Sequence, residues 1–102
     1  MAQQFAAMSD YPRLESILER LVKLAPESAE SWYDLAAMKN ILGKPSEALT
    51  ALRQALKLSA VRIAKDPKAK DLLRELPTDP RFNSLRRNPE FQELARGSAA
   101  KR

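Results

Sequence analysis

The side chains that could do chemistry in this sequence are carboxylates, hydroxyls and lysines, because its 102 residues include no cysteine and no histidine. That composition removes thiol nucleophiles, imidazole bases and almost every site for zinc or another transition metal. Two pairs of carboxylates, Glu27 with Glu30 and Glu90 with Glu93, have the spacing of one helix face. Acids near a helix N-terminus are expected from the helix dipole alone. We therefore predict a chain that is not an enzyme, with no catalytic residue, no metal and no cofactor.

Phosphate-binding loops and membrane signals are also missing from the pattern. Gly43 and Gly97 are the only glycines, and neither stands in a Gly-Lys-Ser or Gly-Lys-Thr loop. No apolar run approaches the ~18 residues that span a bilayer. The opening Met-Ala-Gln-Gln lacks the basic residues of a secretory signal. We expect a soluble, cytoplasmic chain with no membrane partner.

The positive charge of the chain is concentrated in its second half. Residues 1–51 carry 5 basic and 7 acidic side chains, whereas residues 52–102 carry 13 and 6, and the net charge is +5. Such asymmetry attracts anionic partners. The basic residues that could bind a polyanion are Arg53, Lys57, Arg62, Lys65, Lys68 and Lys70. Their simplest interpretation is a solvated helix face, because no aromatic side chains are interleaved with them to stack on bases.

An internal repeat with an offset of 34 residues organises the first part of the chain. It places Leu18 on Leu52, Val22 on Leu56, Lys23 on Lys57 and Leu24 on Leu58. It also aligns residues 9–12 with residues 43–46, which favour turns. A fixed offset of this kind is the signature of a repeat architecture. The first copy begins midway through a helix, and a turn is expected at residues 9–12.

Helical periodicity predicts two long helices in the second copy. Apolar residues recur at spacings of three and four over residues 28–42, after the start signal of Pro26 and Ser28. Gly43 and Pro45 end that helix. A second helix opens at Ser46 and continues to about residue 64. The two should form an antiparallel pair joined by a tight turn.

Three short helices are expected after the repeat, because an N-cap residue precedes a proline three times. The pairs are Asp66-Pro67, Asp79-Pro80 and Asn88-Pro89, and each proline suits the first position of a helix. We predict helices over residues 67–76, 80–87 and 89–96. Gly97 marks the last stop, and residues 98–102 should form a loose tail.

The last two of these helices repeat one pattern nine residues apart, as "DPRFNSLRR" and then "NPEFQELAR". Phe82 with Leu85, and Phe91 with Leu94, are spaced to form compact buried pairs. A helical array needs a terminal unit that covers its last apolar face. We therefore expect this segment to close the array, with its arginines on the wet outer side.

Residues 29–60 resemble a tetratricopeptide repeat. The family pattern is met by Trp32, Leu35, Ala36, Ala48 and Leu52. The resemblance implies an all-α fold of antiparallel helix hairpins in a right-handed superhelix, closed by short C-terminal helices. It divides a single domain, 1–97, into a partial repeat (1–28), a full repeat (29–65) and a cap (66–97).

Three residues depart from the family pattern. Lys39 stands where the family often has tyrosine, and we expect it to loosen the groove side. Ala60 stands where proline is common, and it allows the second helix to continue. Leu14 stands where a small alanine is usual.

The resemblance further implies a non-catalytic scaffold that binds a peptide or protein segment in a concave groove. The groove residues it assigns are Gln3, Ala7, Glu30, Tyr33, Ala37, Asn40 and Ile41. Tyr33 and Ala37 occupy places where carboxylate-clamping versions use lysine and asparagine, which disfavours chaperone tails. The alternatives are groove residues that are merely solvated, and a basic surface for RNA or another polyanion. Steep salt dependence would distinguish polyanion binding from peptide binding.

The N-terminal helix has no preceding helix to cover all of its apolar residues. These are Leu14, Ile17, Leu18, Leu21 and Val22. Contiguous exposed apolar surface favours association. We expect either further repeats before this segment or a homo-oligomer formed through residues 14–22.

Overall fold

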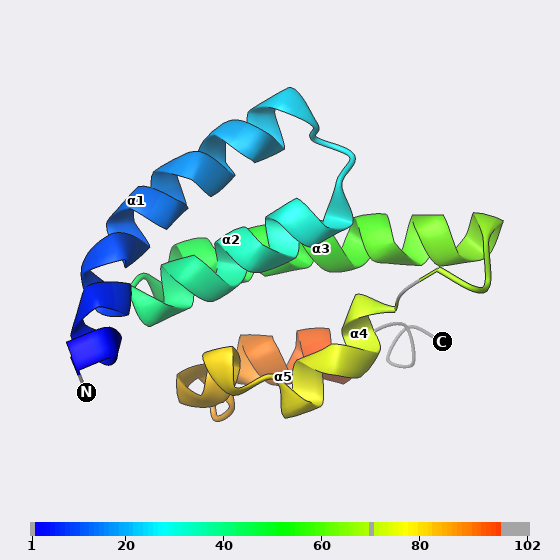
Figure 1. Cartoon of the computed structure of the whole chain (residues 1–102). Helices are drawn as coiled ribbons and strands as arrows, with labels where there is room; N and C mark the ends of the chain where they lie inside the picture. The colour runs from blue at the N-terminus through cyan, green and yellow to red at the C-terminus, as the bar shows by residue number, and fades with distance from the viewer. Residues whose placement is uncertain (1, 70, 97–102) are drawn as a thin grey trace.

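The computed structural model describes residues 2–69 and 71–96, with side chains from residue 10 onward, and this part of the chain contains no β-strand. Its elements in order are α1 (Ala2–Leu24), α2 (Ala29–Ile41), α3 (Pro45–Lys65), α4 (Leu72–Glu75), η1 (Leu76–Thr78), η2 (Pro80–Leu85) and α5 (Pro89–Arg96) (Figure 1). The prediction of an all-α protein is confirmed. The tail predicted at 98–102, together with Gly97, lies outside the described residues.

Local capping signals set both ends of α2, and the second of them forms the turn to α3. The hydroxyl of Ser28 accepts a hydrogen bond from the Ser31 backbone N–H and begins α2. At the other end Gly43 adopts a positive φ of 79°, a conformation that suits a residue without Cβ. The N–H of Lys44 then reaches the carbonyl of Lys39 at 2.8 Å, closing a Schellman motif. The two predicted helices and their turn are confirmed.

Small side chains set how closely α2 and α3 approach. Ala36, Ala48 and Ala55 are completely buried, and Leu52 is buried among them. Alanines at facing positions let helix axes come together, while larger side chains fill the remaining space. Beyond the hairpin, α3 continues to Lys65, as expected from Ala60 in place of a proline.

The turn predicted at residues 9–12 is wrong, because α1 continues through it. Pro12 lies inside the helix and is exposed. Its ring already fixes φ near the helical value, and at an exposed site water can satisfy the carbonyl that loses its N–H partner. Residues 9–12 therefore align with the turn of the second copy but are themselves helical.

The helix predicted from Asp66-Pro67 is also wrong in its start. Asp66 ends α3, and its carboxylate accepts from the N–H of Lys68 at 3.1 Å in a turn. The next helix begins after Asp71, whose carboxylate accepts from the N–H of Leu73 at 3.1 Å. The N–H of Leu72 is taken by the buried hydroxyl of Ser59 on α3 at 3.2 Å. A tertiary hydrogen bond therefore selects the second of two available caps.

The segment predicted as a helix over 80–87 is the 3₁₀-helix η2. Asp79 caps it through the N–H of Arg81, and the N–H of Phe82 bonds back three residues to Asp79. In a 3₁₀-helix, residues three apart lie on one side. That geometry places Phe82 and Leu85 together, and both are buried. The helix predicted at 89–96 is confirmed as α5.

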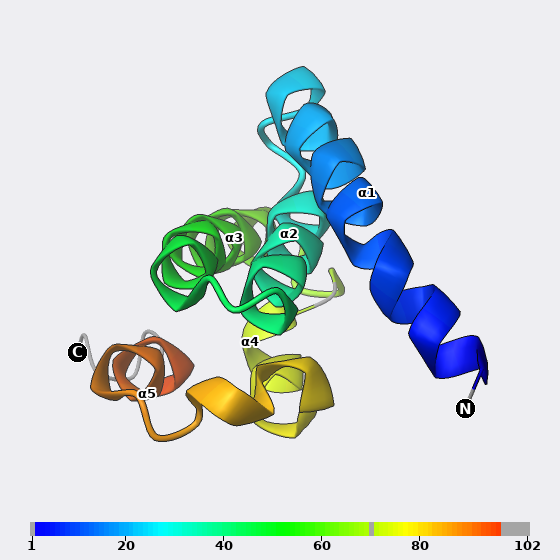
Figure 2. The ribbon, with the colours of Figure 1, turned by 90° about the vertical axis from the view of Figure 1, so that its left-hand side faces the viewer.

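The C-terminal elements lie against α2 and α3 on the side away from α1 (Figures 1 and 2). η2 packs on α2, while α4 and α5 pack on α3. An aromatic row joins the layers, with ring centroids 5.4 Å apart for Tyr33 and Phe82 and 5.9 Å apart for Phe82 and Phe91. Phe82 and Phe91 are buried as predicted. Tilted and stacked ring contacts of this kind add stability beyond that of the apolar area they bury.

A buried lysine connects α1 to the hairpin. The Nζ atom of Lys39 lies 2.7 Å from Glu15, 2.6 Å from Glu19 and 2.7 Å from Glu47, which belong to α1, α1 and α3. Lys44 adds a second ammonium 2.8 Å from Glu15. The expectation that Lys39 loosens the groove side is therefore wrong. Its side chain holds three helices together on the α1 side of α2.

Electrostatics in this cluster favour the charged forms. Burial lowers the pKa of Lys39, but its hydrogen bonds to the three carboxylates outweigh burial and raise it above the ordinary value. Lys39 and then Lys44 hold the pKa of Glu15 below that of an ordinary glutamate. Lys39 also lowers the pKa of Glu47.

Replacing Lys39 with methionine is expected to destabilise the fold by about 2–4 kcal/mol, because it leaves the buried Glu15 with only Lys44 as its cation. Urea unfolding followed by circular dichroism measures this change. The matched control is Lys57→Met at an exposed position of α3, where a change within about 0.5 kcal/mol is expected. Equal stabilities of the two variants would contradict the assigned role of Lys39.

As the pH falls, the wild type is expected to lose more stability than a Glu15→Gln variant. A carboxyl whose pKa is lowered by folding contributes stability above its ordinary pKa of ~4.3 and loses it as pH falls through the lowered value. Thermal unfolding between neutral pH and pH ~3 tests this. Glu27→Gln, at an exposed position, should follow the wild type. Parallel curves for wild type and Glu15→Gln would show that Glu15 is not the group concerned.

Candidate partner-binding surfaces

The predicted groove face of α2 is covered by the chain's own C-terminal segment. Tyr33, Ala37 and Asn40 are buried, and their neighbours are η2 and the residues before it. Glu30 is exposed and Ile41 is half-buried at the edges of this face. The side chains of Gln3 and Ala7, also assigned to the groove, lie outside the described residues.

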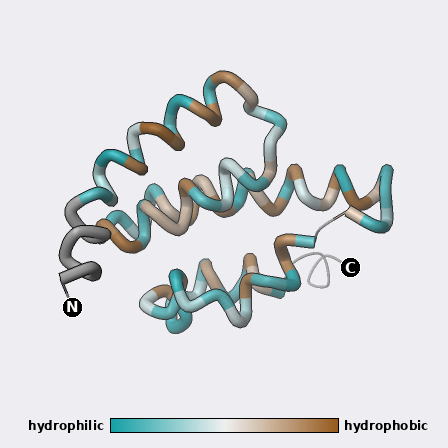
Figure 3. The backbone as a smooth tube through the Cα atoms, in the orientation of Figure 1, coloured by the Kyte–Doolittle hydropathy of each residue, from teal (hydrophilic) through white to brown (hydrophobic). Residues whose placement is uncertain are grey.

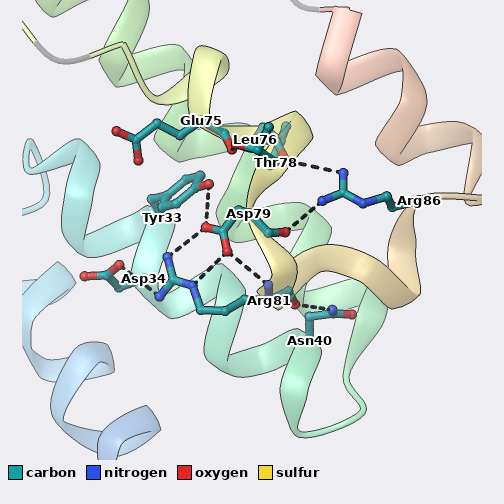
Figure 4. Close-up of polar contacts among 9 residues, drawn as sticks. All are labelled: Tyr33, Asp34, Asn40, Glu75, Leu76, Thr78, Asp79, Arg81 and Arg86. Carbon is teal, nitrogen blue, oxygen red and sulfur yellow. Dashed lines mark hydrogen bonds and ion pairs between the residues drawn. The ribbon is translucent and has the colours of Figure 1, made fainter.

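The contact between α2 and the C-terminal segment centres on one carboxylate (Figure 4). The hydroxyl of Tyr33 donates to Oδ2 of Asp79 at 2.8 Å. Arg81 donates from Nη2 to the same oxygen at 3.0 Å and from Nε to Oδ1 at 3.2 Å. Its guanidinium lies 5.6 Å from the centre of the Tyr33 ring and reaches Asp34 at 3.4 Å. The expectation that the arginines stay on the wet outer side is wrong for Arg81.

Two further side chains hold the same segment. Nδ2 of Asn40 donates to the carbonyl of Arg81 at 2.8 Å and to the hydroxyl of Ser84 at 3.0 Å. Arg86 donates to the carbonyls of Asp79 at 2.8 Å and Leu76 at 3.4 Å (Figure 4). Arg86 therefore also turns inward, whereas Arg87 is exposed as expected.

Electrostatics in this network favour a neutral Tyr33 phenol and an ionised Asp79 carboxylate. Burial raises the pKa of Tyr33, and the carboxylate of Asp79 raises it further. For Asp79, burial acts to raise the pKa, but hydrogen bonds from Arg81 and Tyr33 outweigh it and lower the pKa. The phenol stays protonated and the carboxylate stays ionised with both oxygens engaged. The arrangement acts as a clamp between α2 and the C-terminal segment.

No sequence signal pointed to this clamp or to the Lys39 cluster. Asp79 was identified as an N-cap, a local role that the structure confirms. Its partnership with Tyr33 joins residues 46 positions apart. Glu15 stands among apolar residues of α1. A charged residue within an apolar stripe is the one signal that could have indicated a buried ion pair.

Two of the predicted polyanion-binding residues lie beside carboxylates of other helices. Arg53 pairs with Glu90 of α5, and Arg62 lies 3.9 Å from Glu30 of α2. The remaining described members of the set, Lys57, Lys65 and Lys68, are exposed. Lys70 lies outside the described residues. Partial neutralisation by neighbouring carboxylates weakens the case for a phosphate-binding surface, although polyanion binding stays a prediction.

One face of α1 carries exposed apolar side chains. Leu14, Ile17, Leu21 and Leu24, here called the α1 stripe, are exposed to 40%, 44%, 41% and 80%. Spacings of three, four and three place them in one row along the helix. Leu18 and Val22, predicted to belong to the same association face, instead pack into the core. Figure 3 shows apolar residues recurring along α1, and Figures 1 and 2 show α2 as the helix beside it.

Within the described residues there is no group of three or more acidic side chains placed to hold a metal ion. No helix among them is long and apolar enough to cross a membrane. Comparisons with protein-family models, with curated proteins and with solved structures found no match to this chain.

Replacing Tyr33 with phenylalanine is expected to cost about 1–3 kcal/mol, because it leaves the ring against Phe82 but removes a hydrogen bond to a charged carboxylate. Chemical denaturation measures the loss. Tyr11→Phe, on α1, is the matched control and should be neutral. A Tyr33→Phe protein as stable as the wild type would show that the clamp contributes little.

Proposed function

We propose that this chain is a non-catalytic protein-interaction module of the tetratricopeptide type, and that its partner binds the α1 stripe. The observation that carries the proposal is the exposure of four apolar side chains in one row on α1. A surface helix of a stable globular protein normally turns such a row inward. A row left open on a helix whose other face is packed is typical of a binding surface.

The internal repeat supports this assignment. The offset of 34 residues that relates α1 to α3 places Leu14, Ile17 and Leu21 on Ala48, Ala51 and Ala55. Those three alanines of α3 are 0–4% exposed, and α3 packs on α2.

The packed face of α1 also matches α3 at the offset of 34 residues. Leu18 and Val22 are covered on α1, as their counterparts Leu52 and Leu56 are on α3. The α1 stripe therefore occupies the place that receives a helix in the second copy.

The groove side is less favourable for a partner. A peptide lying against Tyr33 and Asn40 would have to displace residues 76–85, break the bond between Tyr33 and Asp79, and expose the fully buried Phe82. Exposing one buried phenylalanine alone costs about 2–3 kcal/mol. The α1 stripe is open without any such rearrangement.

Proteins captured from extracts of cells that make this chain test the proposal. An Ile17→Glu, Leu21→Glu double variant should lose partners that the wild type retains, because charges in the row oppose its burial. The matched control is Val61→Glu, which changes an apolar residue of α3 that is 50% exposed and should retain the partners. Circular dichroism confirms that each variant folds. Identical captured proteins for wild type and the double variant would refute binding through α1.

A further inference from the structure

We infer that the occupant of the α1 stripe is an amphipathic α-helix of a partner protein that carries acidic residues along the edge of its apolar face. The inference rests on the proposed function, because it names the partner for the same surface. It has two supports, one from the shape of the surface and one from its charge.

The shape argument concerns what the stripe can accommodate. From Leu14 to Leu24 the row spans about 15 Å, or nearly three turns of helix. The equivalent row on α3, formed by Ala48, Ala51, Ala55 and Leu58, is packed into the core, and α3 packs on the helix α2. A row with the same spacing on α1 is suited to an element with the same periodicity. A helix matches it turn by turn, whereas an extended peptide does not.

The charge argument concerns the edge of the stripe. Arg13 and Arg20 are exposed and seven residues apart, so they lie on one edge of the row, and Lys23 is one turn beyond Arg20. None of the three makes an ion pair with any residue that the structure describes.

Two of the three acids of α1, Glu15 and Glu19, are engaged elsewhere. Glu15 and Glu19 both bind Lys39 on the opposite side of the helix. Asp10 is the remaining exposed acid among residues 10–24. The edge therefore presents uncompensated positive charge, and an acidic edge on the partner would complement it.

The same charges argue against a second copy of this chain as the occupant. Two identical helices related by a two-fold axis and paired antiparallel bring the same edge of each helix together. The edge of one copy that carries Arg13 and Arg20 would then lie against the same edge of the other copy. Like charges at such an interface oppose association, whereas a partner with glutamates or aspartates on that edge has no such penalty.

Two stapled helical peptides of about 18 residues test the inference, since unstapled helices of this length are marginal in water. Both carry the same apolar row with the spacing of the α1 stripe. One has glutamates along both edges of the row, and the control has lysines at those positions. Fluorescence anisotropy measures the binding of each labelled peptide to the full chain.

We expect the acidic peptide to bind at least about tenfold more tightly than the basic peptide at moderate salt. An Arg13→Glu, Arg20→Glu variant should reverse this preference. A Lys57→Glu, Lys65→Glu variant makes the same change in net charge on α3 and should keep it, which separates a local effect from overall attraction. All four positions are exposed, so the folds should be retained.

Three results would overturn the inference. The first is equal binding of the two peptides. The second is a preference that both charge-reversal variants alter equally, and the third is no binding of either peptide. If both peptides bind equally and Ile17→Glu, Leu21→Glu abolishes both, the partner chemistry is wrong while the proposed function stands.

The mass of the chain in solution decides between a partner helix and a second copy. Sedimentation should give a monomer over a wide range of concentration. A dimer that Ile17→Glu, Leu21→Glu dissociates would make a second copy the occupant and overturn the inference.

Discussion

The burial of α2 on both of its faces is the constraint on which the rest of the structure depends. Six consecutive residues of this helix, 35–40, are buried, so no side of it is left to water over that length. Buried polar groups are costly unless they are hydrogen-bonded. Lys39 and Asn40 therefore need partners from other elements, and they find them in opposite directions. One reaches the carboxylates of α1 and α3, and the other reaches the backbone of the C-terminal segment.

The burial of α2 on both faces accounts for what lies on each side of this helix. On one side, Tyr33 and Asn40 bind the segment that begins at Asp79, so the face that resembles a peptide groove is filled from within the chain. On the other side, the attachment of α1 is ionic and centres on Lys39, with Leu18 and Val22 completing the contact. Because that contact uses only one face of α1, the opposite face remains exposed. The apolar row is thus a consequence of how α1 is attached.

The use of charge follows from the same arrangement. Glu15, Glu19 and Glu47 bind Lys39, and Glu15 also binds Lys44. Asp79 binds Arg81 and Tyr33. These hydrogen bonds and ion pairs lower the pKa values of Glu15 and Asp79. Arg13, Arg20 and Lys23 at the surface of α1 make no ion pair with the residues that the structure describes. Net charge counted along the sequence placed the basic character in the second half, whereas engagement in the fold produces a basic edge in the first.

The sequence by itself determined the local structure of the α2–α3 hairpin and of the last helix. Periodicity and capping residues predicted α2, α3 and α5, because those signals act over one or two turns: Ser28 caps α2 and Gly43 supplies the positive φ of the turn. Spacing alone also marked Phe82 and Phe91 as buried.

Only the tertiary structure decided which of two caps starts α4, since Ser59 selects it through a contact across the fold. It also decided that Lys39 faces α1, that Asp79 closes the groove face, and that the α1 stripe stays open. These outcomes depend on contacts such as Ser59 with Leu72, Lys39 with Glu19 and Tyr33 with Asp79, which join residues 13, 20 and 46 positions apart. No local propensity specifies such contacts.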